Sequence, residues 1–216
     1  VQTPRGIVLV DAGMDSTGRD VLQGLAAMNA DVSSLRSILL THWHNDHAAG
    51  ARALQESTGV SAYCHVDDAP QLKRETARMG WRGTLSEKIP EWGVFVLFKG
   101  LLGEATPRAI LDPQFLSNGE IVDEFFEVIA TPGHTPGHLS YYYKPENVLF
   151  AGDALAVVNA HVRFMARAVT PDLNAARNSM RKCLSLKLDV LCPGHRLPLQ
   201  NNVHQKCDQM LKHIDQ

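Results

Sequence analysis

The sequence has few cysteines, and their spacing excludes a disulfide scaffold. Only 4 cysteines occur in 216 residues, and no two of them form a C-x-x-C pair. Disulfide-rich proteins have a far higher cysteine density, and redox or zinc motifs need close pairs. We therefore interpret all four, Cys64, Cys183, Cys192 and Cys207, as reduced thiols, and we expect a reducing, cytoplasmic location.

Long hydrophobic runs and an excess of either charge are also missing. No window approaches the roughly 20 apolar residues that a membrane-spanning helix needs. The nearest run, residues 94–98, is closed by Lys99 and Gly100. A formal net charge of -2 leaves no broad basic surface for nucleic acid or for a membrane. We therefore expect no membrane partner, and the composition disfavours nucleic acid.

The beginning of the chain suggests that an earlier segment is missing. Pro4-Arg5-Gly6 predicts the turn of a hairpin whose first strand should precede it, and the chain has no initial Met. We therefore expect the first N-terminal strand to be absent, and any targeting segment with it. The hydrophobic content of 44% is enough for the core of one domain spanning residues 1–216.

Strand-like and helix-like segments alternate along the first third of the chain. The apolar run 6–10 is followed by Asp11 and Gly13, as expected for a buried strand that ends in a tight turn. Apolar residues at helical spacing then continue to Asn29. Further segments predict a strand over 37–40, a helix over 48–55 and a strand over 60–64. This alternation predicts an α/β fold.

Four side chains that can bind a metal follow the strand predicted over 37–40. His42, His44, Asp46 and His47 lie within six positions. In extended backbone, residues two apart share a face, so His42 and His44 can point at one cation. Asp46 and His47, at the turn into the helix, are directed at a second cation. Ordinary surface histidines are the alternative, but so dense a group is typical of metal ligands.

Further candidate ligands follow later strands. The strand predicted over 125–130 runs into two Pro-Gly-His units, which form a rigid loop that carries His134 and His138. Asp153 follows an apolar strand that starts at Asn147, and His195 follows a strand over 188–192. His65 also follows a strand, but a lone histidine at such a place is more often structural.

The pattern H-x-H-x-D-H after a strand resembles the signature of the metallo-β-lactamase superfamily, and Asp11-x-Gly13 is similar to the end of an early strand in that family. The resemblance implies an αββα sandwich, short here of its first N-terminal strand. It also implies a ligand set: His42, His44 and His134 for one metal, Asp46, His47 and His195 for the other, and Asp153 shared. Asp11 would support the metal loop through hydrogen bonds, and His138 would lie behind the ligands or on the substrate side.

The resemblance also implies a reaction. A dinuclear hydrolase of this kind attacks the carbonyl carbon of an ester, thioester or lactone with a metal-bridging hydroxide. Asp46 and Asp153 would be catalytic carboxylates as well as ligands. Imidazole and carboxylate ligands without thiolate favour two zinc ions, with iron or manganese as alternatives. The substrate would be a small molecule with an acyl group.

Departures from known branches narrow the resemblance. β-Lactamases proper carry Cys or Ser where Asp153 stands. The acyl-homoserine lactonases carry a Tyr where this chain has Ala154-Leu155-Ala156. Glyoxalase II enzymes add a helical domain after the last ligand, whereas this chain has one predicted helix over 203–214. The resemblance therefore favours a lactonase-like or glyoxalase II-like branch over a β-lactamase.

Three other functions stay open. A phosphodiesterase or RNA-processing nuclease of the same superfamily would use the same ligands together with a phosphate-binding face. Basic residues that could form such a face are Arg163, Arg167, Arg177, Arg181 and Lys182. A persulfide dioxygenase-like enzyme would hold a single iron. A metal-dependent interaction module would keep the ligands without turnover.

An aromatic-rich insert around residues 80–111 interrupts the regular pattern. Its large apolar residues are Trp81, Trp92, Phe95, Phe98, Leu101 and Leu102. Such a segment suits a lid that lines a substrate pocket, and it equally suits a homodimer contact. Arg196, directly after His195, would favour an anionic group on the substrate or would be an ordinary surface arginine. Further along, Thr170-Pro171-Asp172 predicts a helix start with Thr170 as the N-cap.

Overall fold

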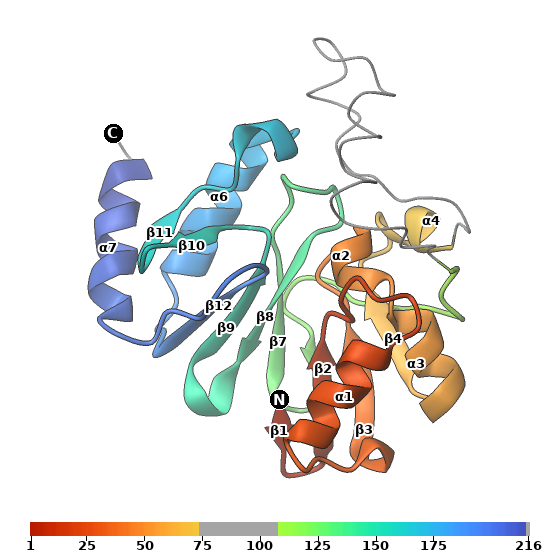
Figure 1. Ribbon diagram of the computed structural model, residues 1–216. Helices are drawn as coiled ribbons and strands as arrows, with labels where there is room; N and C mark the ends of the chain where they lie inside the picture. Colours follow the sequence, from red (N-terminus) through yellow and green to blue (C-terminus); the bar gives the residue numbers. More distant parts are fainter. Residues whose placement is uncertain (74–107, 215–216) are drawn as a thin grey trace. The chain divides into compact units, whose positions relative to one another are not determined.

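The computed structural model describes residues 1–73 and 108–214. The chain divides into two compact units (Figure 1). Unit 1 comprises Val1–Tyr63 and Ala69–Gln114, and unit 2 comprises Cys64–Asp68 and Phe115–Gln216. Each unit combines a β-sheet with helices, as the predicted α/β class requires.

Unit 1 contains a five-stranded sheet in the order β1-β2-β3-β4-β5. Its strands are β1 (Gln2–Thr3), β2 (Gly6–Val10), β3 (Leu35–Leu39), β4 (Ser61–Cys64) and β5 (Gln114–Phe115). β2, β3 and β4 run parallel, whereas β1 is antiparallel to β2, with Thr3 opposite Gly6. The predicted hairpin turn at Pro4-Arg5 is therefore confirmed, and the strand before it, which was expected to be absent, is present as the two-residue β1. Because neighbouring parallel strands end at the same edge, Asp11 and the histidine loop emerge together.

The helices of unit 1 connect these strands. They are α1 (Arg19–Ala27), the short 3₁₀ helix η1 (Val32–Ser34), α2 (Asn45–Ala48), α3 (Ala51–Thr58) and α4 (Ala69–Leu72). α1 packs Leu25 against Ile7 and Leu35 in a small apolar core. The helix predicted over 48–55 is confirmed over 51–55 by α3, but its start is wrong, because Ala48 belongs to the separate helix α2 and the chain breaks before Ala51. A Cβ atom at Gly50 would collide with the carbonyl oxygen of Ala12, so the close approach of this turn to β2 requires glycine.

Unit 2 contains a second five-stranded sheet in the order β12-β9-β8-β7-β6, and a separate hairpin β10-β11. The strands are β6 (Ile121–Val122), β7 (Phe126–Ala130), β8 (Leu139–Tyr143), β9 (Val148–Gly152), β10 (Ala156–Val158), β11 (His161–Arg163) and β12 (Val190–Pro193). β12 is parallel to β9, and β6, β7, β8 and β9 pair antiparallel. Sequence reasoning missed β8, whose three consecutive tyrosines favour a strand.

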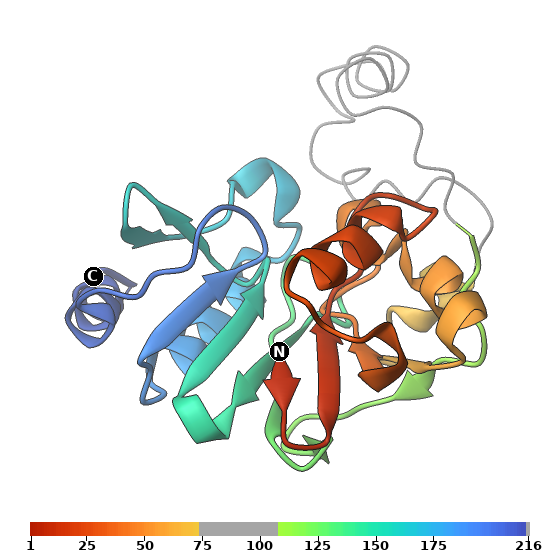
Figure 2. The same cartoon turned by 60° about the horizontal axis from the view of Figure 1, so that its bottom comes forward.

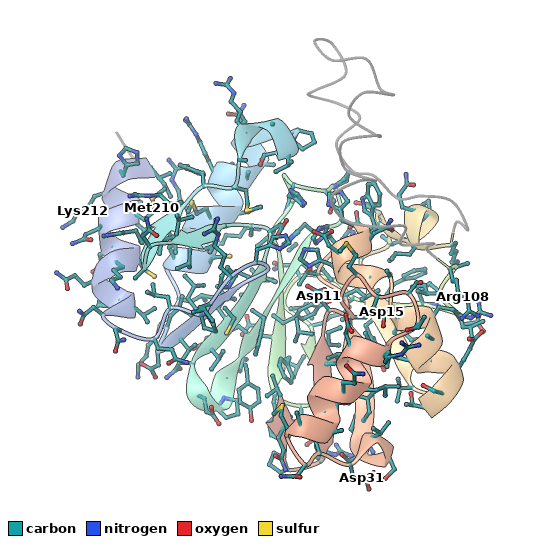
Figure 3. All side chains as sticks on the ribbon, in the orientation of Figure 1. Asp11, Asp15, Asp31, Arg108, Met210 and Lys212 are labelled. Atoms are coloured by element: carbon teal, nitrogen blue, oxygen red, sulfur yellow. The ribbon has the colours of Figure 1, made fainter. Side chains whose placement is uncertain are left out.

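Two long helices, α6 (Leu173–Leu184) and α7 (Val203–Ile214), complete the core of unit 2. Figures 1 and 2 show α6 behind β9 and β12. Met180 on α6 and Cys207 on α7 are buried in one apolar cluster with Leu149 and Leu191 of the sheet. Figure 3 shows the two faces of α7: Met210 is 5% exposed, whereas Lys212 points to solvent. The amphipathic closing helix over 203–214 is thus confirmed.

The start of α6 differs from the prediction. Asp172 is the N-cap, because its Oδ1 accepts hydrogen bonds from the backbone N–H groups of Asn174 at 3.1 Å and Ala175 at 2.9 Å. The predicted cap Thr170 instead donates its hydroxyl to the carbonyl of Ala166 at 3.0 Å, beside the short 3₁₀ helix η3 (Arg167–Val169). The helix therefore begins at Leu173, two residues later than predicted.

The four cysteines form no disulfide, as predicted. All four cysteines are free thiols. Burial raises the pKa of Cys183 to about 12, and those of Cys192 and Cys207 to about 11, so these three are thiols and not thiolate nucleophiles at neutral pH.

In the described ranges, no helix is long and apolar enough to cross a membrane. The aromatic residues of the insert, from Trp81 to Leu102, lie outside the described residues.

Candidate metal centre

The histidine loop of unit 1 follows the central strand of three parallel strands. The Leu40 N–H donates to the carbonyl of Tyr63 at 2.9 Å, which extends the β3–β4 ladder by one residue. The chain then turns into α2, for which His44 is the N-cap residue in extended conformation. His42 and His47 are 1% and 2% exposed, whereas Asp46 is exposed. The loop therefore presents two buried imidazoles and one carboxylate that reaches solvent.

The three imidazoles of this loop are clustered. His42 Nε2 lies 3.0 Å from His44 Nδ1, and the ring centroids of His42 and His47 are 4.1 Å apart. Two nitrogen ligands on one tetrahedral zinc, each at ~2.0–2.1 Å from the metal, would be about 3.3 Å apart. The His42–His44 pair thus has nearly the spacing that a shared cation requires. Asp46 Oδ2 lies 3.8 Å from His47 Nε2, which suits the second pair proposed from the sequence.

Asp11 fixes the orientation of two of these rings. Its carboxylate accepts hydrogen bonds from the Thr41 N–H at 2.7 Å and from the Thr41 hydroxyl at 2.9 Å. It also accepts the Nδ1–H of His47 at 2.7 Å. Because the Thr41 hydroxyl donates to Asp11, its oxygen accepts the Nδ1–H of His42 at 3.0 Å. Both rings therefore carry a proton on Nδ1, and in the neutral ring Nε2 is the unprotonated nitrogen that can bind a metal.

In unit 2, one carboxylate lies between two candidate histidines. Asp153 follows β9 and is 4% exposed. Its Oδ2 lies 3.3 Å from Nε2 of His134 and 3.5 Å from Nε2 of His195. The His195 loop is tied to the end of β9, because the Gly194 N–H donates to the carbonyl of Gly152 at 2.8 Å. The adjacent carboxyl ends of β9 and β12 thus bring Asp153 and His195 together.

His138 is held in a buried network and is 0% exposed. Its Nε2 accepts the backbone N–H of Asp153 at 2.9 Å, so its ring proton is on Nδ1, which donates to the Thr131 hydroxyl at 2.8 Å. That hydroxyl donates to Ser140 Oγ at 2.9 Å, and Ser140 donates to the carbonyl of Ala151 at 3.0 Å. Of the two predicted roles for His138, this geometry favours the place behind the ligands.

Asp68 also positions the second histidine loop, and sequence reasoning missed it. Its buried carboxylate accepts the Thr135 hydroxyl and the Gly137 N–H, both at 2.8 Å. A Cβ atom at Gly137 would lie 2.7 Å from the Asp68 backbone nitrogen, so glycine is needed for this approach. The sequence signal was a pair of aspartates after a strand, at Asp67 and Asp68, next to the His65 that was weighed as a ligand. His65 itself makes a local contact, accepting the Asp67 N–H at 3.2 Å.

The candidate ligands of both units suit a metal ion that is intermediate between hard and soft, such as zinc or iron. Each unit offers imidazole nitrogens and carboxylate oxygens at the ends of strands, with a second layer of hydrogen bonds behind them from Asp11, Thr41 and His138. Such a donor set suits zinc or iron, and the second layer is the usual means of orienting ligating histidines. The assignment of these ligands to two shared metals stays a prediction.

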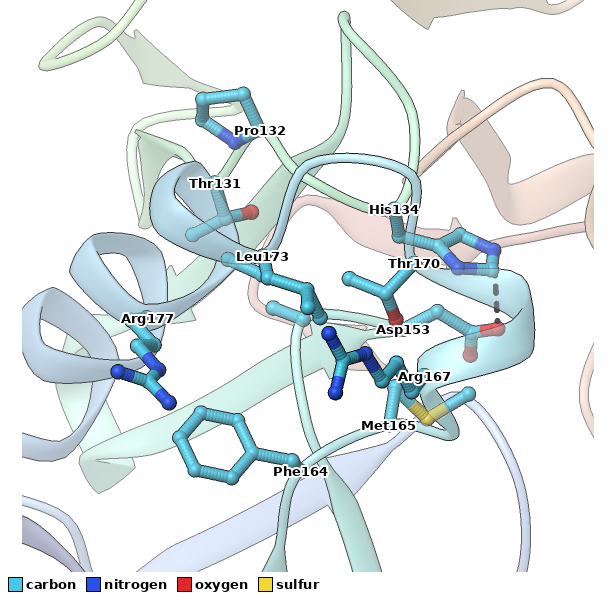
Figure 4. Close-up of a pocket in the computed structure, with 12 residues that line it drawn as sticks. Thr131, Pro132, His134, Asp153, Phe164, Met165, Arg167, Thr170, Leu173 and Arg177 are labelled. Atoms are coloured by element: carbon cyan, nitrogen blue, oxygen red, sulfur yellow. Dashed lines mark ion pairs between the residues drawn. The ribbon is translucent and has the colours of Figure 1, made fainter. Parts of the chain in front are cut away.

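A cavity of about 190 Å³ lies beside His134 and Asp153 in unit 2 (Figure 4). Apolar side chains of Phe164, Met165 and Leu173 line it together with the cations Arg167 and Arg177. The basic residues proposed from the sequence to form one phosphate-binding face therefore do not all lie in the same place: Arg167 and Arg177 line the cavity. The other two residues of this set on α6 have backbone partners elsewhere: Arg181 donates to the carbonyl of Ile214 at 3.3 Å and Lys182 to that of Ala130 at 3.1 Å.

Arg196, the cation that the sequence placed beside the site, does not line this cavity. It is exposed and has a φ of 73°, in the left-handed region that favours glycine. The substrate role of Arg196 stays a prediction.

Comparison with known proteins finds relatives over most of the chain. The family model of the metallo-beta-lactamase superfamily matches residues 1–195. The chain is 28% identical over 215 residues to the probable metallo-hydrolase YflN of Bacillus subtilis (strain 168), covering 91% of this chain and 77% of the relative. It is 32% identical over 122 residues to a hydroxyacylglutathione hydrolase of Pseudomonas aeruginosa (strain LESB58), covering 56% of this chain and 33% of that relative. The solved structure of TTHA1623 in a di-iron-bound form has a TM-score of 0.69 and 25% identity, covering 96% of this chain and 90% of that chain.

Proposed function

The chain belongs to the metallo-beta-lactamase superfamily and is a metal-dependent hydrolase, and from this premise we propose that it is a dinuclear enzyme that cleaves esters, thioesters or lactones. Two metals would be held by His42, His44 and His134 on one side and by Asp46, His47 and His195 on the other, with Asp153 shared. Bound in this way, two divalent cations would supply an activated water and polarise the carbonyl oxygen.

The observation that carries the proposal is the position of Asp153. One oxygen of its carboxylate faces His134 at 3.3 Å and His195 at 3.5 Å, and these histidines are assigned to different metals. A carboxylate has lone pairs on both oxygens and can hold two cations at the ~3.5–4 Å separation of two-metal sites. Its backbone is fixed by His138 and its side chain is almost fully buried, so the group is held in place before metals or substrate arrive.

Relatives support the carbonyl substrate class. The hydroxyacylglutathione hydrolases among them act, as their name says, on an acyl group joined to glutathione, which is a thioester. The aligned part is about a third of those proteins, so a thioester is one candidate within the class and not an assignment. The di-iron form of TTHA1623 makes iron an alternative to the zinc that the ligand chemistry favours.

A panel of small substrates tests the proposal. The metal-free protein would be loaded with zinc, iron or manganese and assayed on 4-nitrophenyl esters, a γ-lactone, an S-acyl thioester and a 4-nitrophenyl phosphodiester. We expect turnover of a carbonyl substrate, and Asp153→Asn should lower kcat/KM by at least about 100-fold, since it removes the charge shared by two metals. His204→Ala, on the exposed face of α7, is the matched control and should keep the activity. Faster cleavage of the phosphodiester than of any carbonyl substrate would overturn the proposal in favour of the nuclease branch.

A further inference from the structure

The cavity beside His134 and Asp153 is too small for a whole substrate. Its volume of about 190 Å³ is below the ~300–1,000 Å³ of pockets that enclose complete small-molecule ligands. It therefore suits one arm of a substrate whose reacting group lies at the candidate ligands. Phe164 and Met165, which follow β11, line it together with Arg167 of η3, and the first turns of α6 contribute Leu173 and Arg177.

The walls combine apolar surface with two cations that have no carboxylate partner in the described part of the chain, although Asp153 also lines the cavity. Within the described part of the chain, no carboxylate forms an ion pair or hydrogen bond with the guanidinium of Arg167 or Arg177. Other arginines differ: Arg52 and Arg108 both pair with Glu56. Asp172, the nearest acid along the chain, uses Oδ1 to cap α6. In Figure 4, Arg167 and Arg177 extend toward Phe164, and the His134–Asp153 pair lies on the opposite side.

We propose that this cavity binds a carboxylate on an arm of the substrate. Arg167 and Arg177 would hold the carboxylate, because a guanidinium offers paired N–H donors that match its two oxygens. Phe164 and Leu173 would pack against the short methylene chain that joins the carboxylate to the reacting carbonyl. This inference rests on the proposed function and narrows its substrate class to esters, thioesters or lactones with a short anionic arm.

Matched pairs of esters test the inference. One pair carries the charge on the acyl side, 4-nitrophenyl hemiglutarate against 4-nitrophenyl pentanoate. The other carries it on the leaving group, 4-carboxyphenyl against phenyl pentanoate. The quantity measured is the ratio of kcat/KM for the anionic ester to kcat/KM for its neutral partner. We expect a ratio of about 10 or more in at least one pair at low salt, because a hydrogen bond between a guanidinium and a carboxylate contributes about this factor to binding. The ratio should fall as the salt concentration rises, because salt screens the attraction between the two charges.

Arginine variants test whether the preference for anionic esters arises in the cavity. The double variant Arg167→Gln/Arg177→Gln should lower the ratio about tenfold, and each single variant by less. Arg163→Gln, an exposed arginine on β11 that does not line the cavity, should leave the ratio unchanged. An unchanged ratio in the double variant, or an equal loss in Arg163→Gln, would refute the inference.

Binding to metal-free protein separates this inference from the proposed function. Calorimetric titration with glutarate should give weak binding that the double variant weakens about tenfold, and inorganic phosphate should bind less tightly than glutarate. Arginine-dependent glutarate binding in a protein that turns over no ester would sustain the carboxylate site and refute the hydrolase proposal. Ester hydrolysis without charge preference and without glutarate binding would refute the carboxylate site and sustain the hydrolase proposal. Tighter binding of phosphate would overturn the carboxylate assignment.

Discussion

Asp11 has a larger effect on the candidate centre than its position outside the ligand pattern suggests. It is the acceptor for His47 directly and for His42 through Thr41, so one carboxylate sets the tautomer of two rings. Its φ of 59° places it in the left-handed region, where aspartate is among the few tolerated residues. The strand end therefore has a conformation that aims the carboxylate at the histidine loop.

Removing Asp11 should weaken metal binding without removing a ligand. We expect Asp11→Ala to lower zinc affinity by about 10- to 100-fold, the usual effect of losing a hydrogen-bond partner behind a ligating histidine. Asp15→Ala is the matched control, because Asp15 lies on the same loop (Figure 3), but in the described part of the chain its carboxylate bonds with nearby residues such as Thr17 and Asp20 and not with a candidate ligand. Competition with a fluorescent zinc chelator measures the affinities. Equal affinities for the two variants would show that Asp11 does not orient the ligands.

His47 allows a direct count of metals. If it binds only the second metal, His47→Ala should lower the zinc content from about two to about one per chain while the fold persists. Elemental analysis after dialysis, together with far-UV circular dichroism, measures both quantities. Retention of two zinc ions by the variant would exclude His47 as a ligand, and a single tightly bound iron in the native protein would favour the dioxygenase branch.

His138 should matter for stability as well as for the position of Asp153. His138→Ala removes the acceptor of the Asp153 N–H and leaves a void in a wholly buried site, so we expect a loss of about 2–4 kcal/mol in the free energy of unfolding. His204→Ala provides the contrast, since its side chain is 80% exposed, and should change stability by less than about 0.5 kcal/mol. Urea denaturation of the metal-free proteins measures the difference. A surface-like effect of His138→Ala would contradict the network.

At the scale of elements, α6 links the second histidine loop to the cavity. Gly133 in that loop has a φ of 138°, and a Cβ atom there would lie 2.5 Å from the backbone nitrogen of Ala176. Ser179 on the same helix donates to the carbonyl of Pro132 at 2.7 Å. The helix therefore supports the loop that carries His134 while its first turns line the cavity with Leu173 and Arg177.

Substitutions at the N-cap of α6 test where this helix begins. Asp172→Ala leaves the N–H groups of Asn174 and Ala175 without their acceptor, and should cost about 1 kcal/mol, within the 0.5–2 kcal/mol range for lost caps. Thr170→Val, at the position predicted as the cap from the sequence, should cost less, because its hydroxyl bonds with Ala166 outside the helix. Urea midpoints of the two variants decide the order, and a larger loss at Thr170 would contradict the assigned helix start.

At the scale of the molecule, the proposed ligands divide between the two units. Unit 1 supplies His42, His44, Asp46 and His47, and unit 2 supplies His134, Asp153 and His195. If both sets share two metals, metal binding stabilises the folded chain as a whole. We expect free zinc at about 100 times its dissociation constant to add about 2.7 kcal/mol per site to the free energy of unfolding. Thermal denaturation with zinc and with a chelator measures this shift, which should be smaller for His47→Ala. An unchanged midpoint would contradict metal binding by the folded protein.

The sequence by itself determined the family, the α/β class and the candidate ligands. Zinc ligands come from few residue types, chiefly His, Cys, Asp and Glu, so a dense run such as 42–47 is visible without a structure. The apolar runs of β2 and β7 and the helical period of α7 were also visible, because burial leaves a local pattern. The break at Gly50 was not, because it depends on the approach of the distant Ala12. At the start of α6, Thr170 and Asp172 are both good capping residue types, and the choice of Asp172 follows from the bond that takes the Thr170 hydroxyl to Ala166.

Only the tertiary structure decided which polar groups support the ligands and which cations flank them. Asp68 contacts Thr135 and Gly137 across 67 and 69 positions of sequence, and His138 reaches the backbone of Asp153 across 15. Five basic residues looked equivalent in the sequence, yet Arg167 and Arg177 line a cavity while Arg181 and Lys182 bond with backbone carbonyls. The physical reason is that composition and period report burial and ligand chemistry, whereas hydrogen-bond partners and cavity walls depend on how distant segments pack.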